Sequence, residues 1–276
     1  MSRTPGQFLA IGSGAVIAMM LIGVAGFKFV DVSTETSRHD VLHYAQPIRH
    51  IDVDSATVSL VGTPGNSVTV GRTISEGLGR PAPHAELVGD TLRLSGGCVG
   101  FLLAHCGIKY TITVPATTDI SVHDASGTVS ASGMRADLSL TAESGQLSAS
   151  DIRGSVTMSA DSGQISIDSV RGDTVSLRAD SGRISASGIA AKTFTADADS
   201  GSIDAEFSSD PTTVTTRADS GSIDIAVPPD GTDYDLTGVG AGSGRFDINE
   251  VRARTGAPHK IIANAPSGRI SVRYSR

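Results

Sequence analysis

Carboxylates recur at one position in the second half of the chain, each directly before a Ser-Gly dipeptide. If these copies stack on one another, a row of carboxylates forms, and a bound cation would relieve its repulsion. The same residues also suit a tight turn, because Gly accepts positive φ and Asp and Ser hydrogen-bond nearby backbone amides. We interpret the motif as turn chemistry and keep a cation ladder as the alternative. The ladder would consist of Asp161, Asp180, Asp199 and Asp219.

No other set of residues has the spacing of a catalytic or metal site. His39 and His43 are four residues apart, but no third ligand accompanies them. The abundant serines have no His partner at a fixed spacing, and the glycines at 238–244 do not match a dinucleotide-binding motif. The sequence therefore predicts a protein that is not an enzyme and that binds no cofactor.

The Ser-Gly dipeptide marks an internal repeat, which must position these carboxylates. Successive glycines of the dipeptide are 18, 18, 19, 19, 20, 23 and 24 residues apart. Self-similarity at a period near 20 residues is typical of stacked repeat architectures. The glycines predicted to form the repeat turn are Gly127, Gly145, Gly163, Gly182, Gly201, Gly221, Gly244 and Gly268.

Apolar residues alternate with polar residues after each repeat glycine. In one copy, Ile165 and Ile167 flank Ser166, and in a later copy Ile223 and Ile225 flank Asp224. This period of two indicates a half-buried strand. A second alternating run follows in each of the early copies, so one copy reads as strand, turn, strand, turn. The predicted fold class is all-β, a single-stranded β-solenoid of about eight coils that resembles a parallel β-helix.

Composition excludes one class of partner. The chain has 32 Gly, no Trp, a formal net charge of -7 and a pI near 5.4. Nucleic-acid binding depends mainly on Lys and Arg, so no nucleic-acid partner is expected. An acidic surface rich in small residues suits solvation, cations or a cationic partner.

An uncharged apolar segment lies near the N-terminus. Residues 8–27 contain no charge and, as a helix, would span about 30 Å, which matches the hydrocarbon core of a bilayer. We expect a short cytoplasmic stub and an uncleaved single-pass anchor, which together make up residues 1–30, with an extracytoplasmic remainder; a cleaved signal peptide is the alternative. Three further parts follow: a linker (31–47), an irregular β-rich cap with the first coils (48–115) and the repeat solenoid (116–276).

The chain contains two cysteines, Cys98 and Cys106. A close pair in an exported domain predicts one disulfide that closes a short loop. Free thiols and a metal site are the alternatives, although only His105 lies beside the pair and no zinc spacing is present.

Several short motifs carry a resemblance to a known family. Ile112-Thr113-Val114-Pro115 is followed by the Ser-Gly-x-Ile units, and Ile225-Ala226-Val227-Pro228 repeats the Val-Pro element. The chain resembles the bacterial putative-adhesin family of β-strand-repeat domains of unknown function over residues 48–275. The resemblance implies a β-solenoid at the cell envelope, and an N-terminal anchor is common in that family.

These observations lead to one functional expectation and two alternatives, with a carbohydrate-active enzyme placed last, because some parallel β-helices cleave polysaccharides. We expect an adhesin-like surface module that binds an envelope polymer or protein through outward side chains of the repeats. These include Ser166, Asp204, Asp224 and Asp247. One alternative is a scaffold of solenoids that join end to end, with the terminal coil at residues 270–273 as the joint. The other is an extracytoplasmic sensor that signals through a membrane partner.

Overall fold

The computed structural model describes residues 36–275, except for 47, 55–56, 77–79, 82, 97, 100–105, 241–243 and 250. The expected anchor at residues 8–27 therefore lies outside the described residues. Within the described part, no helix is long and apolar enough to cross a membrane. The prediction of an all-β fold is confirmed, since these residues form strands joined by turns.

The strands fall into three groups along the chain. The N-terminal group comprises β1 (Thr36–Tyr44), β2 (His50–Asp54), β3 (Thr57–Thr63), β4 (Val68–Glu76), β5 (Arg80–Pro81), β6 (His84–Val88), β7 (Thr91–Ser95), β8 (Cys98–Val99) and β9 (Cys106–Pro115). The repeats form β10 (Ile120–Ser132), β11 (Leu138–Ile152), β12 (Val156–Phe207) and β13 (Thr213–Val227). The C-terminal group comprises β14 (Tyr234–Gly240), β15 (Arg245–Asn249), β16 (His259–Asn264) and β17 (Ser267–Tyr274). β12 is long because its extended backbone continues through several turns.

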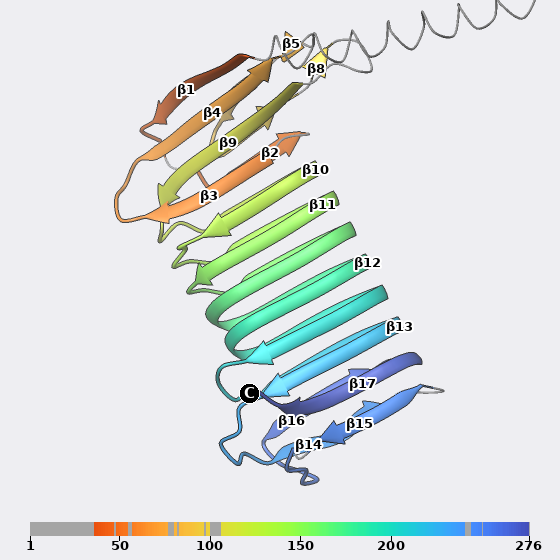
Figure 1. Ribbon diagram of the computed structural model, residues 1–276. Coiled ribbons are helices and arrows are strands. Elements are labelled where there is room, and N and C mark those ends of the chain that lie inside the picture. Colours follow the sequence, from red (N-terminus) through yellow and green to blue (C-terminus); the bar gives the residue numbers. More distant parts are fainter. Residues whose placement is uncertain are drawn as a thin grey trace, which may run out of the picture.

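The strands build two layers that are joined at the Ser-Gly corners. The first layer has the order β6-β7-β2, then the first halves of β10 to β13, then β16-β14. The second layer has the order β1-β4-β9-β3, then the second halves of β10 to β13, then β17-β15. The layers run as one continuous stack from β1 at one end to β14 and β15 at the other (Figure 1). Each full turn through both layers is called a coil below.

Parallel register aligns equivalent residues of successive coils. Ala131 pairs with Ala149, which pairs with Ile167, and the same alignment continues from Ala205 to Ile225. These inward side chains are buried between the two layers, whereas the residues between them point outward. The period-two alternation in the sequence thus becomes a core of aligned apolar columns, with polar columns on the outer faces.

The repeat glycines form one of these columns at the corner. Gly127, Gly145, Gly163, Gly182, Gly201 and Gly221 all have φ between 135° and 158°. A Cβ on Gly182 would lie 1.7 Å from the carbonyl oxygen of Gly163 in the neighbouring coil. The corner therefore requires glycine for two reasons: its backbone conformation and the closeness of the adjacent coil.

The coils do not follow chain order at either end of the stack. At the C-terminal end, β17 lies between β13 and β15, so the last segment of the chain fills the position before the terminal coil. At the N-terminal end, β2 and β3 lie between β10 and the later strands β7 and β9. The expectation that residues 270–273 form an exposed joint is wrong, because Ile270 is paired on both sides and fully buried. The terminal coil instead comprises β14 and β15.

Candidate functional site

One outward column of the second layer carries the side chains that were expected to bind. Ser130, Ser148 and Ser166 are aligned in neighbouring coils, and Asp204 pairs with Asp224 farther along. The column continues from Asp224 through Ser271 to Asp247 in the terminal coil. The structure thus brings all four predicted residues, Ser166, Asp204, Asp224 and Asp247, into one line on one face.

A shallow pocket interrupts this face where serines give way to carboxylates. Its polar lining comprises Ser185, Ser187, Asp204, Glu206, Asp224 and Arg273. Arg273 Nε donates to Asp224 Oδ1 at 3.2 Å, while Asp204 and Glu206 are exposed. The pocket presents carboxylates, hydroxyls and one guanidinium within a few coils, a set that can hydrogen-bond a polyhydroxylated ligand.

Three carboxylates of the predicted cation ladder, Asp180, Asp199 and Asp219, lie close to arginines of the chain itself. Arg178 forms ion pairs with Asp180 at 2.8 Å, Asp197 at 3.3 Å and Asp199 at 3.9 Å. These carboxylates, Asp180 foremost, raise the pKa of Arg178. Arg217 likewise pairs with Asp219 at 2.6 Å. Cation binding along Asp161, Asp180, Asp199 and Asp219 stays a prediction, and a cation there would compete with these guanidinium groups.

Replacing Arg178 with Gln should make the thermal stability of the protein depend on calcium. The substitution leaves three neighbouring carboxylates without their shared guanidinium, so added Ca²⁺ should raise Tm in the variant more than in the parent chain. Lys192→Gln is the matched control, because Lys192 pairs with the single carboxylate of Asp173 at 2.8 Å. Thermal unfolding followed by circular dichroism, with and without Ca²⁺, measures the effect. Equal calcium responses in the two variants would argue against a cation ladder.

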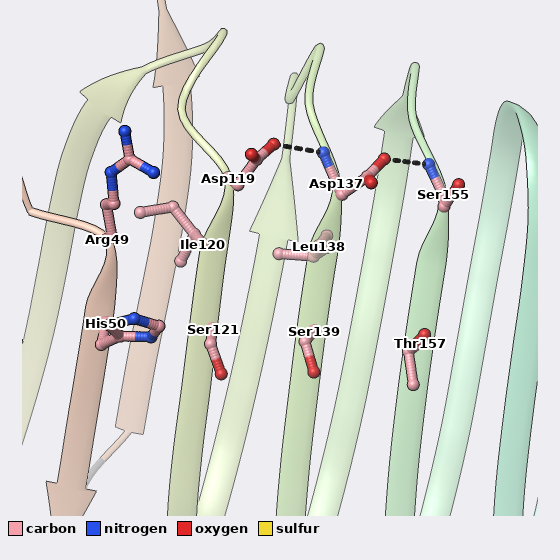
Figure 2. A pocket seen from close by; sticks show the side chains of 10 residues that line it. All are labelled: Arg49, His50, Asp119, Ile120, Ser121, Asp137, Leu138, Ser139, Ser155 and Thr157. Carbon is pink, nitrogen blue, oxygen red and sulfur yellow. Dashed lines mark hydrogen bonds between the residues drawn. The ribbon is translucent and has the colours of Figure 1, made fainter.

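A second pocket, of about 290 Å³, lies on the first layer where β2 meets the repeats. Figure 2 shows Arg49 and His50 on one side and Asp119 and Asp137 on the other. Asp119 Oδ1 accepts a hydrogen bond from the Asp137 amide at 3.1 Å, and Asp137 Oδ1 accepts one from the Ser155 amide at 2.7 Å. One oxygen of each carboxylate thus holds the next turn, so these aspartates have a structural role.

The carboxylates of this pocket were not identified from the sequence, although a signal for them exists. Asp119, Asp137 and Ser155 each stand seven residues before a Ser-Gly dipeptide. Alignment of the copies on this earlier position, rather than on the glycine and the strand after it, would have revealed the column. His50 is brought to the pocket by pairing between β2 and β10, since it aligns with Ser121.

The remaining sequence candidates do not converge on a site. Among the described residues, no group of three or more His, Cys, Asp and Glu side chains has the geometry of a metal site. His39 lies on the exposed strand β1, and its Nδ1 is 3.2 Å from Oγ1 of Thr73 on β4. The side chains of Cys98 and Cys106 lie outside the described residues, so their disulfide stays a prediction.

A family model confirms the repeat architecture. The model described as Toastrack DUF4097 matches residues 90–273, which run from the start of β7 almost to the end of β17. The chain belongs to the Toastrack DUF4097 family. Membership fits the stack of parallel coils, and it agrees with the expected resemblance to adhesin-like repeat proteins.

Solved structures share the fold of this Toastrack chain at low sequence identity. A putative adhesin from Parabacteroides distasonis has a TM-score of 0.55 and 15% identity, covering 86% of this chain and 96% of that one. A putative adhesin from Bacteroides fragilis has a TM-score of 0.50 and 13% identity, with 86% and 97% of the two chains covered. No curated protein matches the chain. At this identity the structural matches establish the fold alone.

Proposed function

We propose that this Toastrack protein is a non-enzymatic, adhesin-like module of the cell envelope that binds a polysaccharide through the second-layer face of its β-solenoid. The observation that carries the proposal is the outward column at Ser166, Asp204 and Asp224. Parallel stacking repeats one polar side chain about every 4.8 Å along this column. The names of the structural neighbours support an adhesin-like role.

Repetition suits a polymer better than a small molecule. Each serine or carboxylate of the column would contribute a weak hydrogen bond, because water competes for the same groups. A polymer that engages several coils at once gains from high effective concentration after its first contact. The pocket lined by Asp204, Glu206 and Arg273 would then fix the position of the polymer along the column.

The test is binding of the full chain, in detergent, to polysaccharides isolated from the cell envelope. The triple variant Ser166→Ala, Ser185→Ala and Asp204→Ala should weaken binding about tenfold or more, because it removes three adjacent contacts of a multivalent site. The comparison variant carries Ser121→Ala, Ser139→Ala and Thr157→Ala in the pocket of Figure 2 and should bind like the parent. Absence of saturable binding, or loss only in the comparison variant, would contradict the proposed site.

The proposal includes attachment to the membrane through residues 8–27, with the described strands on the extracytoplasmic side. Its support is the uncharged apolar run in the sequence. A C-terminal tag on the full chain should be accessible to an impermeant protease in intact cells, while the protein sediments with membranes. A tag protected until the cells are lysed would overturn this orientation.

A further inference from the structure

One inward column runs through the whole second layer and ends differently at its two extremities. Its interior members are all buried, and each is at most 1% exposed. They are Tyr110, Val58, Val129, Leu147, Ile165, Ile184, Ile203, Ile223 and Ile270. The next member after Ile270 is Phe246 of β15, which is 42% exposed. This inward column is therefore only partly covered at the C-terminal end of the stack.

The N-terminal end of the same column is closed by charge. Beyond Tyr110, the column continues through Arg72 of β4 to Asp40 of β1. These two side chains form an ion pair, with Arg72 Nη2 at 3.0 Å from Asp40 Oδ2. An ion pair at the final strand makes this end unattractive to an apolar surface. Head-to-tail stacking of two copies would press Phe246 against the Asp40 carboxylate, which opposes a filament of this kind.

The edge of β15 is also open in its hydrogen bonding. β15 pairs with β17 on one side, and no described strand pairs with its other side. Such an edge presents backbone N–H and C=O groups that can pair with another strand. Figure 1 shows β15 at the end of the stack opposite β1.

The charges on β15 favour one particular partner strand. Arg245 and Asp247 flank Phe246 and share the outward face. Within the parallel pair of β15 and β17, Arg245 lies beside Arg269, which carries the same charge. In an antiparallel pair centred on Phe246, each Arg245 would stand opposite Asp247 of the other strand, and the two Phe246 rings would meet. β15 is therefore complementary to itself.

We propose that two copies of this chain join at their C-terminal ends through antiparallel pairing of β15 with β15, centred on Phe246. The pairing is isologous, so it closes as a two-fold dimer and does not propagate into a fibre. It extends the second layer across the junction and places the two N-terminal ends at opposite extremes of a stack of double length. The dimer contact lies at Asp247, the last member of the outward column, apart from the pocket at Asp204 and Glu206, and it needs no polymer ligand.

The experiment measures the mass of the full chain in detergent micelles by light scattering combined with absorbance and refractive index. The parent chain should form a dimer. Asp247→Arg should weaken dimerisation about tenfold or more, because two pairs of like charges then face each other. The double variant Arg245→Asp with Asp247→Arg should restore the dimer, since it exchanges the charges on both strands.

Val88→Asp is the matched control, because Val88 is an exposed apolar residue of β6 at the other end of the stack. This variant should remain dimeric, while Phe246→Asp should be monomeric. A monomeric parent chain overturns the proposal. So does an Asp247→Arg variant that stays dimeric, which would place the contact elsewhere, for example in residues 8–27. Failure of the charge exchange to restore the dimer also excludes the register centred on Phe246.

Discussion

Replacing Gly182 with alanine is expected to lower the free energy of unfolding by about 4 kcal/mol or more, at the extreme of what one substitution causes. The added Cβ would lie 1.7 Å from the carbonyl oxygen of Gly163. This oxygen cannot withdraw alone, because the backbone of Gly163 also stacks on Gly145 in the coil before it. The φ of 149° at Gly182 adds strain for any residue with a side chain.

The matched control for this substitution is Gly65→Ala. Gly65 has a φ of 154°, close to that of Gly182, but a Cβ there would have no atom within 4 Å. Alanine at Gly65 should cost only the conformational strain, about 1–3 kcal/mol. Urea denaturation of the two variants separates the conformational cost from the steric one. Equal losses of unfolding free energy at both positions would show that the close contact between coils adds nothing to the cost of a side chain at the corner.

The sequence predicted the repeating interior because one coil resembles the next. Alignment on the corner glycine placed Ile165, Ile184 and Ile203 in one inward column, and all three are fully buried. It also placed Asp204 and Asp224 on the outer face. These features depend on local alternation and on parallel register, which short-range sequence patterns encode well.

The order of the coils at the ends could not be predicted in the same way. Because the copies resemble one another, local sequence patterns do not indicate whether β15 or β17 pairs with β13. The longer spacings of 23 and 24 residues and Pro228-Pro229 signalled added loops without showing that the chain skips a position. Long-range contacts decide the order instead, and they join residues too far apart in sequence to form a motif.

One such contact holds the start of the terminal coil. Tyr234 donates a hydrogen bond to Asp210 Oδ1 at 2.5 Å, and Thr232 donates to Asp210 Oδ2 at 2.8 Å. Burial, followed by the hydrogen bond to Asp210, raises the pKa of the Tyr234 phenol. His259 at the start of β16 lies against the Tyr234 ring, with 5.8 Å between ring centroids. Tyr234 thus connects the turn between β12 and β13 to the terminal coil. β16 lies between β13 and β14.

Alanine substitutions at Ile270 and Ile248 should therefore lower the free energy of unfolding by unequal amounts. The loss should be larger at Ile270, because it lies farther inside the stack. Ile270 is fully buried with coils on both sides, so Ile270→Ala should cost about 2–5 kcal/mol of unfolding free energy. Ile248 is only half-buried in the terminal coil, and its truncation should cost about 1 kcal/mol. Stacking in chain order would place Ile270 at the end and reverse the two effects. Urea denaturation in the Asp247→Arg background, where association does not bury Ile248, decides between the two orders.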